Sequence, residues 1–367
     1  MAGIYVHIPF CASRCIYCGF YSTTRRELRQ RYVDAVCKEW QMRSPYINNE
    51  RVHTIYIGGG TPSQLTDRQL EQLFDAIGIA EEVTLECNPD DLTAEYAAVL
   101  SQLPVNRVSM GVQTFSDDRL RFLHRRHTAG QIPTAVERLR QAGIGNISVD
   151  LMFGFPGETL SDWQHDIRSA LQLGVEHLSA YSLMYEEGTP LHKLLESGKI
   201  EPCDEETERQ MYGELIDRLT SAGYEHYEIS NFARPGYRSR HNSSYWHGVP
   251  YIGLGAAAHS FDGQSRQWNI DDVERYIEGV ERGEMVIDRE EQDDTIRYNE
   301  QVMTSLRTCE GLPLDALTPP QRSYCLAQAR RYLDDGLLLL RDGRIRLTRK
   351  GLFVSNMVMS GLMEIGS

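Results

Sequence analysis

Residues 4–18, Ile-Tyr-Val-His-Ile-Pro-Phe-Cys-Ala-Ser-Arg-Cys-Ile-Tyr-Cys, place a short apolar strand directly before three cysteines. The cysteines follow the spacing C-x3-C-x2-C. This spacing would also put three thiols on one face of a helix, but Pro9 and Gly19 bracket the segment and favour a loop. We therefore expect a strand over 4–8 that ends in a cysteine-bearing loop.

The first half of the chain alternates such strands with helix-like stretches. Thr66 and Thr93 can cap two of the helices, and Gly143 and Gly174 stand where helices should end. Six alternating units predict a parallel α/β sheet with right-handed connections, which either closes toward a barrel or stays doubly wound. The expected strands are 4–8, 54–57, 83–87, 107–112, 147–153 and 177–183, and the expected helices are 28–42, 67–77, 93–100, 132–142 and 160–173.

Beyond residue 200 the alternation stops, and the pattern predicts smaller units. Residues 205–222 favour an amphipathic helix, and residues 231–262, rich in Gly, Tyr, Asn and His, favour an ordered loop region. Two apolar strands around Asp342-Gly343 indicate a hairpin, which lies between helix-like stretches. We expect a core barrel over 1–230, a connecting region over 231–295, and a small, mostly helical, winged-helix-like domain over 296–367. The helices expected in the last two are 271–282, 295–308, 319–333 and 348–362.

The composition excludes several classes of protein. The chain has 367 residues and a net charge of −14, from 38 Lys and Arg against 52 Asp and Glu. An acidic balance argues against nucleic-acid binding, including a DNA-binding role for the winged-helix-like part. No apolar run approaches the roughly 20 residues of a membrane span, and the first residues do not resemble a signal peptide. We expect a cytoplasmic, reduced protein, so that Cys37, Cys87, Cys203, Cys309 and Cys325 are incidental thiols.

Polar groups follow several of the predicted strands at their carboxyl ends, where parallel α/β folds carry their functional groups. Gly58-Gly59-Gly60-Thr61-Pro62 follows the second strand, and its glycines would let the backbone approach a ligand closely. Glu86, Gln113 and Asp150 interrupt otherwise apolar strands. Burying each without a partner would cost about 1–3 kcal/mol, so their convergence favours a polar ligand.

Three thiolates on one loop suit a metal or iron–sulfur centre. Zinc normally takes a second pair of ligands, and no CxxC or HxxxH pair is obvious downstream. Three cysteines on a four-iron cluster would leave one iron open to another ligand.

The cysteine motif, with Tyr17 before its third cysteine and Gly-Gly-Gly-Thr-Pro one unit later, resembles the radical S-adenosylmethionine (SAM) superfamily. The opening Tyr5–Cys11 narrows the resemblance to the oxygen-independent coproporphyrinogen III oxidase-like group. It extends nearly from end to end, through the segments 58–62, 111–113, 150–157 and 251–255. It implies a partial (β/α)6 TIM-like radical SAM barrel.

The resemblance also implies roles for residues. Cys11, Cys15 and Cys18 would hold three irons of a [4Fe-4S] cluster, and the amino and carboxylate groups of SAM would take the fourth iron. The positions implied to bind SAM are Tyr5, Tyr17, Gly59, Gly60, Thr61, Glu86, Gln113, Arg125 and Asp150. Arg125 lies in Leu-His-Arg-Arg-His, where the family often has Leu-Gly-Arg-x-His, so that His124 replaces a glycine.

Two features favour the heme chaperone branch of this group over the oxidases. The oxidases have a further cysteine where this chain has Phe20, and residues 241–246 match the motif His-Asn-x-x-Tyr-Trp of the chaperones. His241 is the expected heme ligand, with His247 and His259 as nearby competitors, and Tyr245 and Trp246 could pack on the macrocycle.

The implied function is therefore to bind heme and to deliver it to acceptor proteins. A respiratory, membrane-proximal acceptor and a homodimer are left open. The alternatives are oxidative decarboxylation of coproporphyrinogen III and radical SAM chemistry on another substrate.

Overall fold

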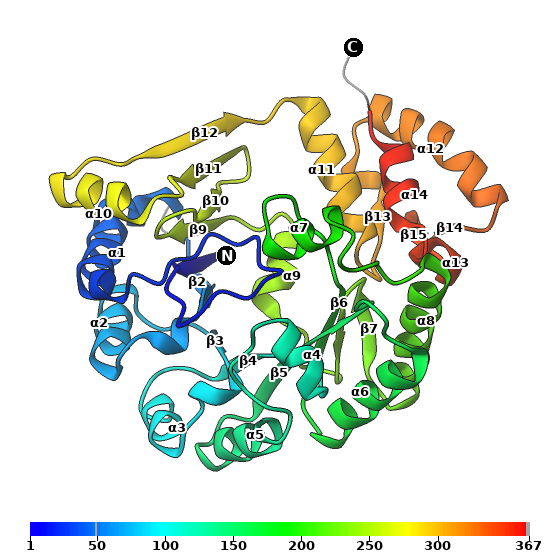
Figure 1. Ribbon diagram of the computed structural model, residues 1–367. Coiled ribbons are helices and arrows are strands. Elements are labelled where there is room, and N and C mark those ends of the chain that lie inside the picture. Colours follow the sequence, from blue (N-terminus) through cyan, green and yellow to red (C-terminus); the bar gives the residue numbers. More distant parts are fainter. Residues whose placement is uncertain (48–49, 365–367) are drawn as a thin grey trace.

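The computed structural model describes residues 1–47 and 50–364. Within them, twelve strands form one curved sheet in the order β12-β11-β10-β9-β1-β2-β3-β4-β5-β6-β8-β7. Most of the helices lie around the outside of the curve, and the C-terminal helices form a separate group at the upper right of Figure 1.

The centre of the sheet consists of six parallel strands in chain order. Isoleucine, valine and leucine side chains of these strands are almost fully buried and form the main core. This confirms the α/β class and the partial (β/α)6 barrel. The strands are β1 (Ala2–Ile8), β2 (Val52–Gly59), β3 (Glu82–Cys87), β4 (Arg107–Gln113), β5 (Asn146–Phe153) and β6 (His177–Ser182).

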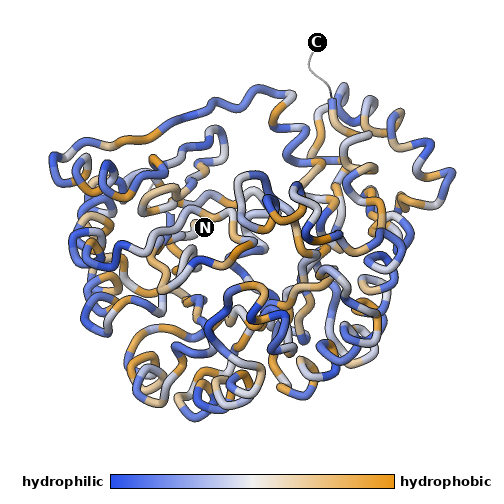
Figure 2. Tube along the Cα trace, in the orientation of Figure 1, coloured by the Kyte–Doolittle hydropathy of each residue, from blue (hydrophilic) through white to orange (hydrophobic). Residues whose placement is uncertain are grey.

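Amphipathic helices cover the outer face of this sheet, and their tubes alternate between hydrophilic and hydrophobic colours (Figure 2). Thr66 and Thr93 cap their helices as predicted, and Gly143 and Gly174 adopt positive φ after theirs. The helices are α1 (Arg29–Arg43), α2 (Asp67–Ile77), α3 (Ala94–Leu100), α5 (Gln131–Gln141), α6 (Leu160–Gln172) and α8 (Glu205–Ser221). Two short helices, α4 (Asp117–Phe122) and α7 (Pro190–Glu196), were not expected from the sequence pattern.

The prediction of a loop region over 231–262 is wrong. This stretch contains β8 (Asn231–Ala233), α9 (Arg240–Trp246), β9 (Tyr251–Leu254) and β10 (His259–Phe261). Strand β9 pairs in parallel with β1 and extends the barrel sheet. The glycine content of residues 231–262 suggested a loop. However, a Cβ on Gly253 would lie 2.0 Å from the carbonyl oxygen of His259. The glycine therefore permits the close approach of the next segment rather than a turn.

Further strands extend both edges of the sheet. Strand β7 (Glu225–Glu228) and β8 run antiparallel beyond β6. Strands β11 (Ser265–Asn269) and β12 (Ile287–Glu291) follow β10 at the other edge, and α10 (Val273–Arg282) lies between them in the chain. The sheet therefore remains open.

The C-terminal part has a core of its own, which runs from Tyr298 to Leu362. A three-stranded sheet in the order β13-β15-β14 packs with helices, as the winged-helix-like prediction requires. The expected last helix over 348–362 is broken, because Val354 leaves the helical conformation. The elements are α11 (Asp294–Leu306), β13 (Leu312–Pro313), α12 (Pro319–Asp334), β14 (Leu338–Arg341), β15 (Arg344–Leu347), α13 (Arg349–Leu352) and α14 (Ser355–Leu362).

An ion pair with a buried carboxylate and two backbone hydrogen bonds attach this C-terminal part to the barrel. The guanidinium of Arg307 lies 2.7 Å from the buried carboxylate of Glu228. The amide of Ile229 donates to the carbonyl of Arg307, and the amide of Cys309 donates to the carbonyl of Tyr227, both at 3.0 Å. We propose to treat 296–367 as a separate unit, because it has its own core.

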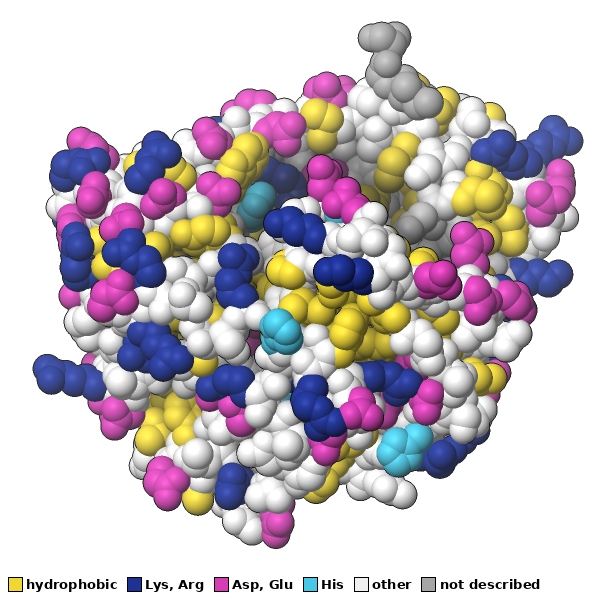
Figure 3. Space-filling view, viewed as in Figure 1, with side chains coloured by type: hydrophobic (Ala, Val, Ile, Leu, Met, Phe, Trp, Pro, Cys, Tyr) yellow, Lys and Arg dark blue, Asp and Glu magenta, His cyan; other side chains and the backbone are white. Residues whose placement is uncertain are grey.

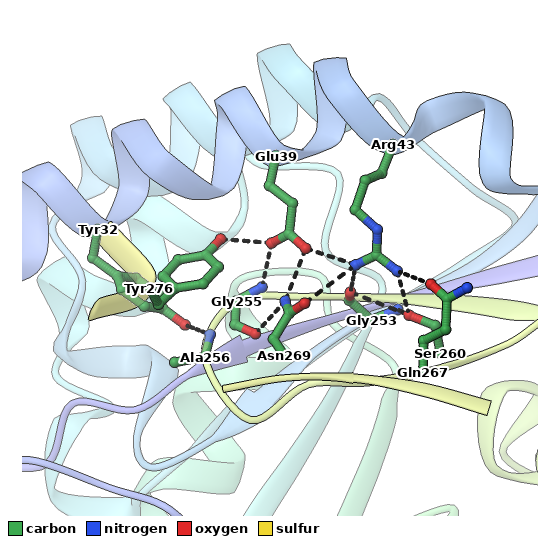
Figure 4. A network of polar contacts seen from close by, with 10 residues as sticks. All are labelled: Tyr32, Glu39, Arg43, Gly253, Gly255, Ala256, Ser260, Gln267, Asn269 and Tyr276. Atoms are coloured by element: carbon green, nitrogen blue, oxygen red, sulfur yellow. Dashed lines mark hydrogen bonds and ion pairs between the residues drawn. The ribbon is translucent and has the colours of Figure 1, made fainter. Parts of the chain in front are cut away.

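A buried polar network fixes the β9–β11 extension to helix α1 (Figure 4). Glu39 is fully buried, and its carboxylate lies 2.7 Å from the guanidinium of Arg43. Glu39 also accepts hydrogen bonds from the Gly255 amide, the Asn269 side chain and the Tyr276 hydroxyl. Arg43 donates to the carbonyl of Gly253 and to Ser260 and Gln267. The pair therefore satisfies polar groups of β9, β10, β11 and α10 that would otherwise be buried without partners.

On the face shown in Figure 3, basic and acidic side chains are interspersed, and hydrophobic side chains gather near the centre. Among the described residues, no helix combines the length and the apolar character that crossing a membrane requires.

Candidate functional site

The cysteine segment is a loop rather than a helix, as predicted. Hydrogen bonds hold it at its start and its middle: the Cys11 amide donates to the carbonyl of Thr23 at 2.9 Å, and the Ile16 amide donates to that of Leu123 at 3.3 Å. Cys11 is buried, whereas Cys15 and Cys18 are half-buried. The loop thus presents its thiols from a backbone fixed by other parts of the barrel.

The glycine-rich loop after β2 packs directly against the cysteine loop. A Cβ on Gly60 would lie 2.8 Å from the backbone of Pro9 and 3.0 Å from the sulfur of Cys11. The Thr61 hydroxyl donates to that sulfur at 3.7 Å. Gly59 adopts a φ of 113°, which side chains other than hydrogen rarely allow. These glycines therefore allow the loop after β2 to approach the cysteine loop closely, so the motif does more than form a tight turn.

Two carboxylates lie on the inner side of the sheet, from β3 and β5. Glu86 accepts hydrogen bonds from the Tyr56 hydroxyl at 2.7 Å and from the Gly59 amide at 3.0 Å. Burial raises the pKa of Glu86 to about 7 and the pKa of Asp150 to about 6. Burial disfavours the anionic form of both carboxyl groups, and a bound cationic ligand would stabilise that form.

Arg125 connects the carboxyl ends of β3 and β4 with the cysteine loop. Its Nη2 donates to the Asn88 side chain at 2.5 Å and to the Gly111 carbonyl at 2.6 Å, and its Nη1 lies 3.7 Å from the Cys15 sulfur. His124, which replaces the family's glycine, adopts a φ of 61°. A glycine would adopt this left-handed conformation easily, and His124 adopts it as well. Arg125 therefore still reaches the site.

These side chains surround one cavity of ≈ 200 Å³ at the carboxyl ends of the strands. Most of the predicted residues line it together: Cys11, Cys15, Tyr17, Cys18, Gly59, Gly60, Thr61, Glu86, Gln113, Arg125 and Asp150. Sequence reasoning missed Asn88 as a member of the site. Its position directly after β3 could have identified it from the sequence. In the structure, its side-chain oxygen accepts a hydrogen bond from Arg125.

Tyr5 does not line this cavity. Its hydroxyl lies 2.9 Å from Nδ1 of His7, and its ring faces a second cavity of ≈ 620 Å³. Phe20 is 71% exposed and lines both cavities. The second cavity therefore adjoins the cysteine loop.

The structure does not bring His241 to either cavity. The side chain is buried, with Nδ1 2.8 Å from the Thr54 hydroxyl and Nε2 2.8 Å from the Tyr245 hydroxyl. Burial, reinforced by Arg107, lowers the pKa of His241 to about 3. With both ring nitrogens engaged, His241 links α9 to β2 and offers no free lone pair in this conformation.

The residues of the first cavity fit an iron–sulfur cluster and SAM by their chemistry. Cys11, Cys15 and Cys18 line a polar cavity together with three carboxylates and three guanidiniums, which match soft metal and charged ligand groups. The carboxylates are those of Glu86, Asp90 and Asp150, and the guanidiniums are those of Arg14, Arg125 and Arg126. Burial raises the pKa of Cys11, and raises that of Cys18 to about 11, so iron binding would release protons.

Among the described residues, no three His, Cys, Asp or Glu side chains converge on a single metal ion. A four-iron cluster differs from such an ion, because each thiolate binds its own iron and the ligands surround the cluster.

Comparison with known proteins identifies the family of the chain. Residues 5–170 match the model of the radical SAM superfamily, and residues 293–354 match that of the HemN C-terminal domain. The fold resembles a solved structure of coproporphyrinogen III oxidase (HemN) from Escherichia coli, with a TM-score of 0.84 at 22% identity, over 99% of this chain and 90% of that one.

Curated relatives match over nearly the whole chain. The heme chaperone HemW of Bacillus subtilis (strain 168) is 35% identical and covers 99% of both chains. The heme chaperone HemW of Lactococcus lactis subsp. lactis (strain IL1403) is 34% identical, over 96% of this chain and 95% of that one. The chain therefore belongs to the radical SAM superfamily, within the HemW group, and it carries a HemN C-terminal domain.

Proposed function

We propose that the chain is a heme chaperone that binds heme, transfers it to an acceptor protein, and carries a SAM-coordinated [4Fe-4S] cluster. The observation that carries this proposal is the similarity to heme chaperones along nearly the whole chain. The cavity that gathers the three thiols and most of the SAM-contact candidates supports the cluster and SAM.

In this proposal each part of the cavity has its own task. Cys11, Cys15 and Cys18 would hold three irons of a [4Fe-4S] cluster, whose remaining iron would be open to the amino and carboxylate groups of SAM. Gly59 and Gly60 leave room for the ligand, and Thr61 donates to the Cys11 sulfur. The remaining candidate contacts to SAM are Tyr5, Tyr17, Glu86, Gln113, Arg125 and Asp150.

The second candidate function is oxidative decarboxylation of coproporphyrinogen III, because the chain resembles the oxidase in fold. Phe20 stands where the oxidases have a further cysteine, which favours the chaperone. The test is to incubate the anaerobically reconstituted protein with SAM, a reductant and coproporphyrinogen III, beside a true oxidase as positive control. We expect no protoporphyrinogen above background. Robust turnover would contradict the chaperone function.

SAM affinity is expected to rise as the pH increases from about 6 to about 8. Burial raises the pKa of Glu86 to about 7, so the carboxyl is protonated below that pH. SAM carries a sulfonium cation that favours the carboxylate, so binding must release this proton, and affinity falls by up to ~tenfold per pH unit below the pKa. The measurement is a SAM titration of the reconstituted protein at several pH values, followed by the cluster spectrum.

The variant Glu86→Gln is the control for this pH effect. It should bind SAM more weakly at pH 8 and lose most of the dependence, leaving only the contribution of Asp150, whose pKa burial raises to about 6. An identical pH profile in the wild type and in the variant would reject Glu86 as the responsible group.

We propose that the chain works in the reducing environment of the cytoplasm, with heme-acceptor proteins as its partners. The eight cysteines are all free, in keeping with that environment.

A further inference from the structure

We propose that heme binds in the cavity between the edge of the barrel sheet and the C-terminal unit, with His247 rather than His241 as its axial ligand. This inference rests on the proposed function, because it assigns a place to a heme that the chain is proposed to carry. It names a site that neither the cysteine motif nor the fold likeness supplies.

The cavity has a volume of ≈ 690 Å³, within the range of about 300–1,000 Å³ that small-molecule and cofactor sites occupy. Residues from both sides line it, including Trp246 and Tyr251 from the barrel and Met303 from α11. A heme offers a large flat apolar ring, and aromatic and thioether side chains are suited to cover it. The C-terminal unit would thus form one wall of the site.

His247 has the hydrogen bonding of a metal-binding imidazole. It is exposed at the end of α9, and its Nδ1 lies 2.7 Å from the carbonyl oxygen of Ser243. A carbonyl can only accept, so Nδ1 carries the proton and Nε2 keeps its lone pair. Among the described residues, no partner occupies Nε2 of His247. Metal-binding histidines commonly donate their other N–H to a carbonyl in this way.

The same cavity offers donors for the two propionate groups of heme. Arg266, Arg297 and Arg344 line it, and guanidinium groups are well suited to carboxylates. Arg266 pairs with Glu300 and Arg297 with Asp294, and each guanidinium has further N–H groups that could donate to a propionate. The side-chain nitrogens of Gln292 and Trp246 are buried without a hydrogen-bond partner among the described residues, and both residues line the cavity. Gln292 is 5% exposed, so an unpaired donor there is costly unless a ligand accepts from it.

The second cavity is a weaker candidate for heme. It is lined by His259, whose ring lies 5.8 Å from that of Trp268 in a stacked pair. Among the described residues, Asp271 and Asp288 line it without any Lys or Arg, so its charge would repel the propionates. In the cavity of His247, by contrast, three arginines outnumber Glu300 and Glu310. Charge therefore favours the cavity of His247.

The test is a hemin titration of the full-length, anaerobically reconstituted protein, comparing His247→Ala with three controls. His259→Ala removes the competitor, and His165→Ala removes an exposed histidine of α6 outside the cavity. His247→Met replaces one iron ligand with another. Far-UV circular dichroism and the cluster spectrum verify that each variant is folded and loaded.

We expect His247→Ala to shift the Soret band and to weaken hemin binding at least ~tenfold, and added imidazole to restore the wild-type spectrum. His247→Met should bind hemin with a different Soret position, and the other two variants should match the wild type. Hemin dimethyl ester, which lacks free carboxylates, should bind the wild type more weakly than hemin.

An unchanged spectrum in His247→Ala, or a loss confined to His259→Ala, would overturn the assignment. Equal affinity for hemin and its dimethyl ester would overturn the proposal that the side-chain donors of this cavity bind the propionates. If the wild type binds no hemin at all, the proposed function fails, and that result is distinct from the failure of this site.

Discussion

Replacing Cys11, Cys15 and Cys18 together by alanine is expected to abolish the visible absorbance of the anaerobically reconstituted protein. The three thiols line one cavity from a single loop, and we propose that they are the only protein ligands of the cluster. Without these thiolates, the loop offers iron no soft ligand. The same sample should lose its bound iron and acid-labile sulfide, which chemical analysis measures independently of the spectrum.

A matched control uses cysteines outside the cavity. Cys203 is half-buried and Cys309 is exposed, so replacing both by alanine changes the thiol count with little effect on packing. This variant should reconstitute to the wild-type iron content. Full retention of absorbance and iron in the triple variant would rule out the ligand assignment, and a loss in the control would show that other thiols take part.

Replacing Glu39 by alanine is expected to lower the free energy of unfolding by about 3–5 kcal/mol, because it leaves a buried guanidinium without its counter-ion. Arg43 is 8% exposed, and Glu39 also accepts from Gly255, Asn269 and Tyr276 (Figure 4). The change therefore removes the contacts that hold the β9–β11 extension to α1. Urea unfolding of the apoprotein, followed by circular dichroism, measures the loss.

The control for this effect lies near the same helix. Glu281 pairs with Arg31 of α1 at 2.7 Å, but both side chains are about half exposed, at 46% and 52%. Exposed pairs contribute little, so Glu281→Ala should leave the unfolding midpoint unchanged. Equal, small effects of both substitutions would show that the buried network does not secure the extension.

The alternation of apolar strands with helix-like stretches predicted the barrel, because the buried isoleucine, valine and leucine side chains of each central strand are a local property of the sequence. Strand β9 escaped prediction, since its four residues include Gly253, whose role depends on the distant approach of His259. The helix caps at Thr66 and Thr93 could be predicted because each depends on a single residue and its near neighbours.

The site shows the same division between local and long-range information. The cysteine spacing and the polar strand ends predicted which residues gather, and the cavity contains most of them. Their motif did not reveal the environment of His241, because Thr54 of β2 meets it from 187 positions away in the chain. A motif identifies residue types, whereas the lone pairs that stay free depend on the assembled fold.

The central claim is that this chain binds heme as cargo. The most direct measurement is a hemin titration of the reconstituted protein, followed by mixing of the loaded protein with a heme-free globin. We expect saturable binding of one heme per chain and recovery of chemically unaltered heme on the globin. Absence of saturable binding, or recovery of a modified tetrapyrrole, would contradict it.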